Sequence, residues 1–213
     1  MRMWFNGERT TVHKKPSGTI YHTIKFCDYY SFDYYQEKKN NQVKMLKIET
    51  ESIPQSSGQL LTRIEAFKEE LGMDKSLNTI KNGFVLGIDV GSTSTDLVVM
   101  SASKEILASL IVPTSTGIDD LIDHLKGEVC EKAGINENEL TKIVTTGYGR
   151  KTTGLKDSIS VTEITCHAKG AHYLYDDART VIDIGGQDSK VIEINENGEV
   201  VNFVMNDKCA AGT

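Results

Sequence analysis

The pattern of hydrophobic and polar residues changes near residue 84. From there on, short apolar runs of strand length alternate with polar turns, beginning with FVLGIDV, TDLVVM and EILASLIV. Residues 118–134 instead repeat apolar side chains at helical spacing, which predicts a helix that Gly134 can end. The pattern then predicts a strand at 142–147, a helix at 160–175, and strands at 179–185, 189–195 and 199–205.

This order of elements predicts an α/β fold. Three strands, a helix, a strand and a helix form one ribonuclease-H-like half. The three strands that follow begin a second half, which stops after its third strand. We therefore expect a ribonuclease-H-like fold with a complete first half and a truncated second half.

The N-terminal third has a different pattern. Strands are predicted at 20–26 and 43–49, and a short helix at 32–39. Residues 57–72 form an amphipathic helix that Gly72 can end, with one face made of Leu60, Leu61, Ile64, Phe67 and Leu71. Residues 1–17 allow no prediction. The polar, aperiodic segment 74–83 is interpreted as a linker, which divides the chain into a segment 1–73, this linker and a domain 84–213, with the first segment as a small α/β appendage.

Composition and charge narrow the class of protein. Of the 213 residues, 38% are hydrophobic and 25% are charged, as in ordinary globular domains. The net charge is −6 and there is no basic stripe, so nucleic acid is not an expected partner. No apolar run is long enough to cross a membrane, and the start MRMWFNGERTTVHKK lacks the apolar core of a signal peptide. These features indicate a cytoplasmic protein.

Two similar turns stand 94 residues apart. IDVG at 88–91 and IDIG at 182–185 both place an aspartate near the end of a predicted strand, two residues before a glycine, and both lead into another strand. Glycine lets a backbone approach an anion closely, and successive N–H groups can cradle phosphate oxygens. Asp89 and Asp183 suit Mg²⁺, bound through water. The two turns are therefore predicted to line one cleft.

The residues predicted to contact the phosphates follow these aspartates. They are Gly91, Ser92, Thr93, Ser94 and Thr95 in the first turn, and Gly185, Gly186 and Gln187 in the second. Neither turn has the signature of a P-loop or of a Rossmann nucleotide-binding motif. A pair of ordinary Asp-Gly hairpin turns is the alternative interpretation.

Five segments together resemble a known family. They are GIDVGSTSTDLVV, TGYGR, EITCHAKGA, IDIGGQDSKVI and NDKCAAGT, in this order between Phe84 and Thr213. They resemble the ATP-dependent activators of 2-hydroxyacyl-CoA dehydratases, within the actin, sugar-kinase and heat-shock-chaperone ATPase superfamily. One departure is Asp96, where the family commonly has lysine; an acidic side chain there would lower phosphate affinity or point away.

The resemblance implies a cofactor set and partners. It implies ATP or ADP with Mg²⁺, and a homodimer that shares one [4Fe–4S] cluster, to which each subunit gives two cysteines. Cys209 matches the first of these, and the second would lie beyond residue 213. A ferredoxin or flavodoxin would reduce the cluster, and one electron would pass to the dehydratase with ATP hydrolysis. This chain alone is expected to be inactive and to hold no stable cluster.

The other cysteines and the histidines receive structural interpretations. No CxxC pair is present. Cys130 and Cys166 are interpreted as core thiols, and His167 and His172 as structural or surface residues without an acidic partner. The loop 147–150 either lies at the cleft or is an ordinary strand–helix connection.

The N-terminal segment has its own resemblance. HTIKFCDYYSFDY and SGQLLTRIEAFKEELG resemble the C-terminal end of a 2-hydroxyacyl-CoA dehydratase subunit, which would make Cys27 a ligand of that enzyme's cluster. A free thiol is the alternative for Cys27. A natural fusion, a frame-shifted gene and a mis-joined gene each fit this arrangement. The rival functions are a small-molecule kinase of the same superfamily and a non-catalytic remnant.

Overall fold

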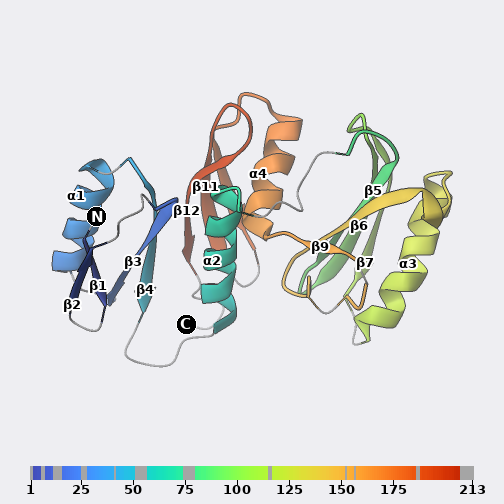
Figure 1. The fold of residues 1–213 in the computed structure, drawn as a ribbon. Coiled ribbons are helices and arrows are strands. Elements are labelled where there is room, and N and C mark those ends of the chain that lie inside the picture. The colour runs from blue at the N-terminus through green and yellow to red at the C-terminus, as the bar shows by residue number, and fades with distance from the viewer. Residues whose placement is uncertain are drawn as a thin grey trace. The chain divides into compact units, whose positions relative to one another are not determined.

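The computed structural model of the chain forms two compact units, Met1–Met73 and Asp74–Thr213 (Figure 1). The structure describes residues 2–5, 8–11, 16–24, 28–40, 42–50, 57–73, 80–114, 117–151, 153–155, 157–185 and 188–206.

The first unit combines a hairpin with a small α/β layer. Strands β1 (Arg2–Phe5) and β2 (Glu8–Thr11) pair antiparallel, in the region where the sequence allowed no prediction. Strands β3 (Gly18–Ile24) and β4 (Lys44–Thr50) pair parallel and are joined through helix α1 (Asp28–Asn40). Helix α2 (Ser57–Glu70) follows. The predicted order of strand, helix, strand and helix is confirmed.

The helix α2 shows one error of the helical-face prediction. Phe67 and Ala66 are buried, and Gly72 ends the helix with a φ of +65° as expected. Leu61, however, is 51% exposed. The apolar face is therefore narrower than predicted, and Ala66 belongs to it while Leu61 does not.

The second unit begins with a five-stranded sheet. Its strands are β5 (Phe84–Val90), β6 (Ser94–Ser101), β7 (Ile106–Pro113), β8 (Leu140–Thr146) and β9 (Ile159–Ser160), in the spatial order β7-β6-β5-β8-β9. The first three pair antiparallel, and β8 and β9 add parallel. Helix α3 (Ile118–Lys132) and a 3₁₀ turn, η2 (Glu137–Glu139), connect β7 to β8. The sequence missed both β9 and η2, because each has too few residues to show a period.

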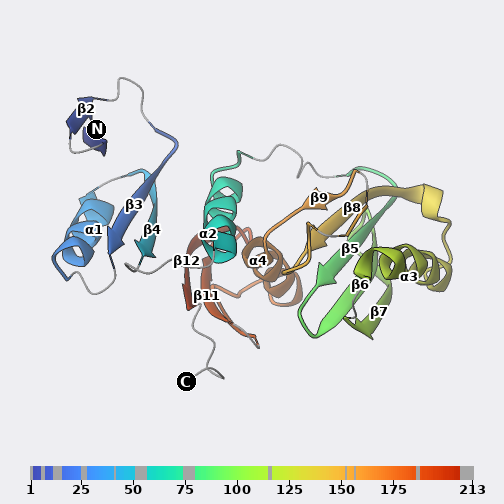
Figure 2. The same cartoon turned by 90° about the horizontal axis from the view of Figure 1, so that it is seen from below.

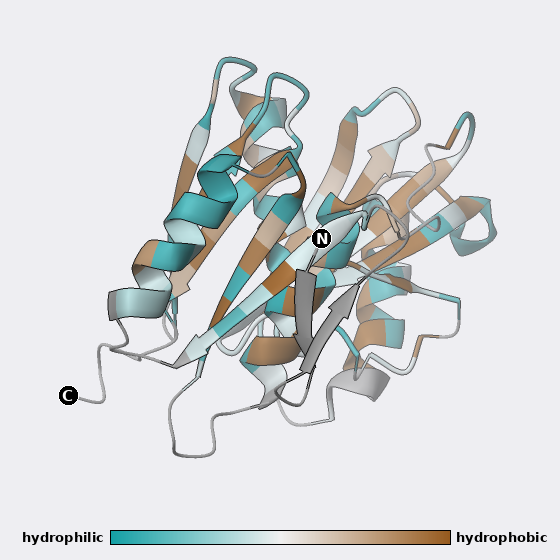
Figure 3. Cartoon of the chain, turned by 60° about the vertical axis from the view of Figure 1, so that its left-hand side comes forward, coloured by the Kyte–Doolittle hydropathy of each residue, from teal (hydrophilic) through white to brown (hydrophobic). Residues whose placement is uncertain are grey.

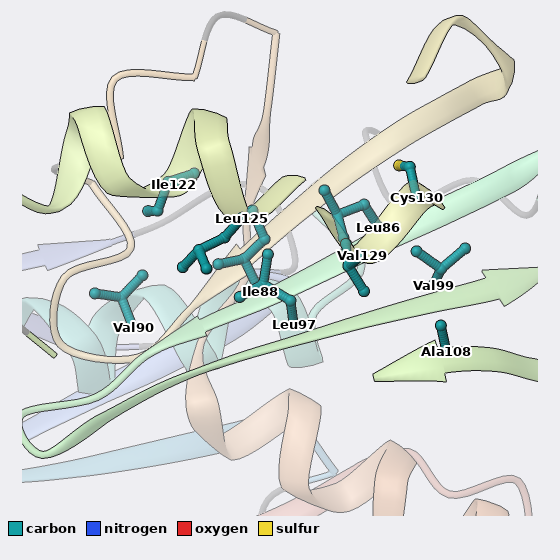
Figure 4. Packing of buried hydrophobic residues seen from close by; sticks show 10 residues of the cluster. All are labelled: Leu86, Ile88, Val90, Leu97, Val99, Ala108, Ile122, Leu125, Val129 and Cys130. Atoms are coloured by element: carbon teal, nitrogen blue, oxygen red, sulfur yellow. The ribbon is translucent and has the colours of Figure 1, made fainter. Parts of the chain in front are cut away.

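One face of this sheet packs on α3 (Figure 4). Alternate side chains of a strand point to opposite faces, so the members of this core alternate along β5 and β6. The same alternation turns Asp89 and Asp96 to the other face. The ten buried residues of the core are Leu86, Ile88, Val90, Leu97, Val99, Ala108, Ile122, Leu125, Val129 and Cys130.

A second, three-stranded sheet follows helix α4 (Glu163–Leu174), which packs against it in both views (Figures 1 and 2). Its strands β10 (Thr180–Ile184), β11 (Ser189–Ile194) and β12 (Val200–Asn206) are all antiparallel. Hydrophobic and hydrophilic residues alternate along the strands (Figure 3). Ile192 and Ile194 are buried, whereas Ile182 and Val204 are 69% and 66% exposed.

The fold class predicted from the sequence is confirmed. The first sheet has the strand order and directions of a ribonuclease-H-like half, and the second sheet repeats its first three strands. The helix predicted at 160–175 is shorter, because residues 159–160 form β9 and Thr162 caps α4. None of the helices in the described part of the chain is long and apolar enough to cross a membrane.

Candidate functional site

The first glycine turn connects β5 to β6. The Gly91 N–H donates to the Ser94 carbonyl over 2.9 Å, and a Cβ on Gly91 would lie 2.9 Å from that same oxygen. Only glycine therefore fits this position without a shift of the backbone. Ser92 and Thr93 are exposed at the tip of the turn, and the Ser94 hydroxyl donates to Asp96 Oδ2 over 3.0 Å.

The neighbouring Thr95 supports the turn from the opposite face of the sheet. It is fully buried, and its hydroxyl shares a hydrogen bond of 2.9 Å with the Thr114 hydroxyl. Thr114 in turn donates to the Gly91 carbonyl, and its N–H donates to the Thr93 carbonyl. The geometry gives Thr95 a role in holding the turn, rather than the phosphate contact that the sequence suggested.

The second turn, between β10 and β11, is built in the same way. The Gly185 N–H donates to the Asp188 carbonyl over 2.9 Å, as Gly91 does to Ser94. Asp183 and Lys190 face each other across the two strands, as Asp89 and Asp96 do across β5 and β6. All four equivalences have the same offset of 94 residues. Gly186 and Gln187, also predicted to contact phosphate, lie outside the described residues.

Lys190 lies at the centre of a charged cluster below this second turn. Its side chain is 3% exposed, and its Nζ lies 2.6 Å from Asp188 Oδ1, 2.9 Å from Glu163 Oε2 and 3.0 Å from Asp183 Oδ2. His167 Nδ1 lies 3.3 Å from the same oxygen of Asp183. Burial alone would lower the pKa of Lys190, but its bonds to Asp188, Glu163 and Asp183 raise it above the ordinary value. Lys190 is therefore a fixed cation.

Asp89 borders the same cluster from the first sheet. Burial raises the pKa of its carboxyl, and the negative charges of Glu163 and Asp96 add to this effect, while His167 and Lys190 oppose it. Three of the groups that act on Asp89 also belong to the cluster around Asp183. Lys190 and His167 contact Asp183, and Glu163 contacts Lys190. The two aspartates that the sequence singled out lie beside one charged group.

The loop after β8 lies against the end of β5. The Gly149 N–H donates to the Val90 carbonyl over 2.9 Å, and Gly147 has a φ of +85°. A Cβ on Gly147 would collide with Asp89 Oδ1 and the Val90 carbonyl. Of the two interpretations of this loop, the structure favours the one that puts it at the site.

Sequence reasoning missed four residues of the site: Glu163, His167, Asp188 and Lys190. His167 was interpreted as lacking an acidic partner, and this was wrong, because Asp183 comes from a separate strand rather than from nearby sequence. The alignment of the two turns carried the missing signal. Extended by two residues beyond Ser94 and Asp188, it matches Asp96 with Lys190.

Two of the four cysteines, Cys130 and Cys166, lie among the described residues. Cys130 is 1% exposed in the core, as predicted, and burial and then Glu137 raise the pKa of its thiol. Cys166 is partly buried on α4. Cys27 and Cys209, the two predicted cluster ligands, lie outside the described residues.

Among the described residues, no group of three or more His, Cys, Asp or Glu side chains is arranged to hold a metal ion. Mg²⁺ commonly takes one or two carboxylates and completes its shell with water and phosphate oxygens. Asp89 fits that pattern, because it is a half-buried carboxylate without an ion pair among the described residues.

Two protein families match the chain. The BadF/BadG/BcrA/BcrD ATPase family matches residues 86–213, and the D-component of 2-hydroxyglutaryl-CoA dehydratase matches residues 10–71. Both resemblances predicted from the sequence are confirmed.

Curated relatives resemble the second unit. The 2-hydroxyisocaproyl-CoA dehydratase activator of Clostridioides difficile is 39% identical over 133 residues, which cover 61% of this chain and 48% of that protein. The (R)-2-hydroxyglutaryl-CoA dehydratase activating ATPase of Acidaminococcus fermentans is 44% identical over 131 residues, with coverages of 61% and 49%. The chain spans about half the length of these curated relatives.

Solved structures agree with the sequence matches. Component A of the Acidaminococcus fermentans (R)-2-hydroxyglutaryl-CoA dehydratase superposes with a TM-score of 0.55 at 42% identity, over 61% of this chain and 49% of that chain. The activator of the 2-hydroxyisocaproyl-CoA dehydratase from Clostridium difficile, with bound ADPNP, has a TM-score of 0.53 at 37% identity, over 61% and 48%.

Proposed function

The chain belongs to the BadF/BadG/BcrA/BcrD ATPase family, and we propose that its second unit is the nucleotide-binding part of an ATP-dependent activator of a 2-hydroxyacyl-CoA dehydratase. Three relatives carry the name of such an activator or activating ATPase, and one similar structure holds ADPNP. The dehydratase partner, ATP hydrolysis and a cytoplasmic location are parts of this proposal.

The observation that carries the proposal is the pair of equivalent turns. Gly91 and Gly185 each close a strand–strand turn with the same hydrogen bond, and each follows an aspartate at the end of its strand. Gly185 is exposed, so its backbone is open to a ligand. Backbone N–H groups and the exposed hydroxyls of Ser92 and Thr93 are donors suited to phosphate oxygens. ATP or ADP is therefore the proposed ligand.

The carboxylates have a separate role in this proposal. Asp89 and Asp183 are the candidates to hold Mg²⁺, directly or through water, because like charges keep them from facing phosphate themselves. Bound Mg²⁺ would neutralise charge on the phosphates, which is the main requirement of phosphoryl transfer. The chain's own groups position the nucleotide and, through the loop at Gly147, orient Asp89.

The electron-transfer part of the proposal depends on the sequence resemblance. Cys209 lies outside the described residues, and its role as a ligand of a [4Fe–4S] cluster shared by a homodimer is proposed from NDKCAAGT. Such a cluster would supply one-electron transfer to the dehydratase, with a ferredoxin or flavodoxin as donor. Cys27 is proposed as a ligand of the dehydratase-type cluster on the same basis.

Titration of the chain with ADP and ADPNP in the presence of Mg²⁺ tests the nucleotide part. Gly185→Ala is the informative variant, since a Cβ there meets its nearest atom at 3.4 Å and the turn can keep its shape. The added methyl group would obstruct a phosphate and weaken binding about tenfold, or 1.4 kcal/mol. Gly170→Ala on α4, where a Cβ meets nothing within 4 Å, is the matched control. Absence of nucleotide binding, or unchanged affinity in Gly185→Ala, would contradict the proposal.

Anaerobic reconstitution with iron and sulfide tests the cluster part. Any iron that the chain retains is expected to be lost in Cys209→Ser. Iron binding that survives this substitution would contradict the role of Cys209. About four irons per dimer would contradict the expectation that this chain alone holds no stable cluster.

A further inference from the structure

The second sheet has one covered face and one exposed face. Helix α4 packs on the face that carries the buried side chains of Lys190 and Ile192. The opposite face carries aliphatic side chains from all three strands, each between 45% and 80% exposed. We call this group the open face, and its members are Ile182, Ile184, Val191 and Val204. The strand register places three of them, Ile182, Val191 and Val204, in one row across the sheet.

The first sheet shows what such a row does when it is covered. With the offset of 94 residues, Ile182 and Val191 correspond to Ile88 and Leu97, which are partners in the same way across β5 and β6. Helix α3 covers that row, and Ile88 and Leu97 are each 1% exposed (Figure 4). Removal of aliphatic side chains from water is the main favourable term in association. The open face therefore has the composition of a core that lacks its cover.

Each helix in the described part of the chain already packs on a sheet. Helix α3 packs on the first sheet, and α4 packs on the other face of the second sheet. Helices α1 and α2 pack on the strands β3 and β4 of the first unit. A second copy of the chain, in contrast, brings an identical open face. Two such faces can cover each other, because sheets pack face to face through their aliphatic side chains.

The polar rim of the open face carries one charge of each sign. A groove on this face has walls that include Arg179 and Glu193 and a floor that includes Val191 and Val204. Arg179 and Glu193 are both exposed, and no ion pair joins either of them to a described residue. The Arg179 guanidinium donates only to backbone carbonyls among its described partners, those of Asp176 and Ala178. Each rim charge is therefore open to the opposite charge of a second copy.

We propose that two copies of this chain pack sheet on sheet through the open face, about a two-fold axis that runs parallel to the strands. Packed sheets lie about 10 Å apart and neighbouring strands about 4.8 Å apart. The aliphatic rows of the two copies then meet, and Arg179, which precedes β10, lies within reach of Glu193 on the central strand of the other copy. The same surface is used by both copies, so the contact closes as a dimer. This dimer requires neither nucleotide nor the cluster that Cys209 implies.

Sedimentation equilibrium of the full chain tests this dimer, with a chelator and a reductant present so that neither metal nor disulfide joins the copies. Three strands make a small interface, so a dissociation constant of about 1–100 µM is expected. Val191→Asp places a charge at the centre of the open face and is expected to weaken the dimer about a hundredfold or more. Ile106→Asp is the matched control, at a 49% exposed position of β7, and should change the dissociation constant less than about twofold.

Exchange of the two rim charges tests how the copies are arranged. Arg179→Glu and Glu193→Arg each bring like charges together, and each is expected to weaken the dimer about tenfold. The double variant restores the opposite charges and should return to within about threefold of the natural chain. A double variant as weak as either single variant overturns the two-fold arrangement.

Two results overturn the interface itself. One is a dimer that survives Val191→Asp in a chain that thermal unfolding shows to be folded, because the copies then meet elsewhere. The other is a chain that stays monomeric at about 1 mM, tenfold above the expected range, because a different segment or a different protein then covers the open face. The rim variants, at exposed positions, carry the test if Val191→Asp does not fold.

Discussion

Gly147 and Asp89 meet where the loop after β8 crosses the end of β5. The loop has a φ of +85° at Gly147, and any Cβ there would collide with Asp89 Oδ1 and with the Val90 carbonyl. The absence of a side chain at Gly147 therefore allows the backbone of the loop after β8 to lie against the carboxylate of Asp89. Glycine is required here for two independent reasons, the backbone angle and the space.

Gly147→Ala is expected to lower both stability and cation binding. The left-handed backbone angle alone costs about 1–3 kcal/mol for a residue with a Cβ, and the collision adds to this cost by displacing Asp89. Gly134→Ala is the matched control, because Gly134 has a φ of +71° but its Cβ would meet nothing within 4 Å. Thermal unfolding and Mn²⁺ titration of both variants make the comparison. If both variants lose the same amount of stability and the same Mn²⁺ affinity, the space beside Asp89 is not limiting.

Lys190→Met is expected to destabilise the second unit by about 3 kcal/mol or more, because it leaves three partly buried carboxylates without their cation. Lys169→Met is the matched control, since Lys169 makes one exposed hydrogen bond, to the Asn197 carbonyl. Its loss is expected to cost less than about 1 kcal/mol. Denaturant unfolding at neutral pH measures both. A second change, Glu163→Gln, is expected to restore part of the stability lost in Lys190→Met.

The pH dependence of this effect follows from the raised pKa of Lys190. A cation whose pKa is raised on folding contributes its full stabilisation below the ordinary lysine value of 10.5 and loses it as the pH rises through the folded value. The difference between the natural chain and Lys190→Met should therefore be constant from pH 7 to about 10 and decline only above that. A decline that begins near neutral pH would mean that Lys190 does not carry the charge.

Local patterns in the sequence predicted most of the fold. The apolar runs of β5 and β6 and the helical stripe of α3 are long enough to show their period, and the structure has them within two residues of the predicted bounds. β9 has two residues, and its strand pairing depends on β8 rather than on any pattern of its own. Such an element is set by tertiary contacts.

The site was only partly predictable for a similar reason. Turn chemistry marked Asp89 and Asp183, because two strand ends with an aspartate two residues before a glycine are unusual in one chain. Lys190 carried no such signal, since a lysine in a strand is ordinarily exposed to solvent. Its burial follows from the packing of α4 on the second sheet, which brings Glu163 to it. The charge of the cluster is thus a property of the packing, which periodicity does not encode.

Limited proteolysis is expected to cut the chain between residues 73 and 83. The compact units divide at Met73 and Asp74, and we propose that the segment up to Gly83 is the linker between them. Lys81 is exposed and is a trypsin site within this segment. Mass spectrometry should show two fragments that resist further digestion, and Lys81→Gln should shift or slow the first cut. First cleavage inside residues 84–205 would contradict this boundary.

Glu70→Gln is expected to stabilise the first unit at neutral pH and to have no effect at acid pH. The Glu70 side chain is 5% exposed, and burial raises the pKa of its carboxyl although Lys44, 3.4 Å away, opposes this. A carboxyl whose pKa is raised on folding contributes stability below its ordinary value of 4.5, and that contribution is lost as the pH rises through the folded value. Glutamine stays neutral at every pH and so avoids this loss. Lys44 keeps its hydrogen bond to the Glu70 carbonyl, which the substitution does not touch.

The measurement is the free energy of unfolding of natural and variant chains from pH 3 to pH 8. The chain has one tryptophan, Trp4, which lies in the first unit, so its fluorescence follows that unit. The two curves should coincide at the acid end and separate as the pH rises, with the variant more stable. Glu37→Gln, at an exposed position of α1, is the control and should run parallel to the natural chain. A variant less stable than the natural chain at pH 7 would mean that the attraction to Lys44 outweighs the burial of Glu70.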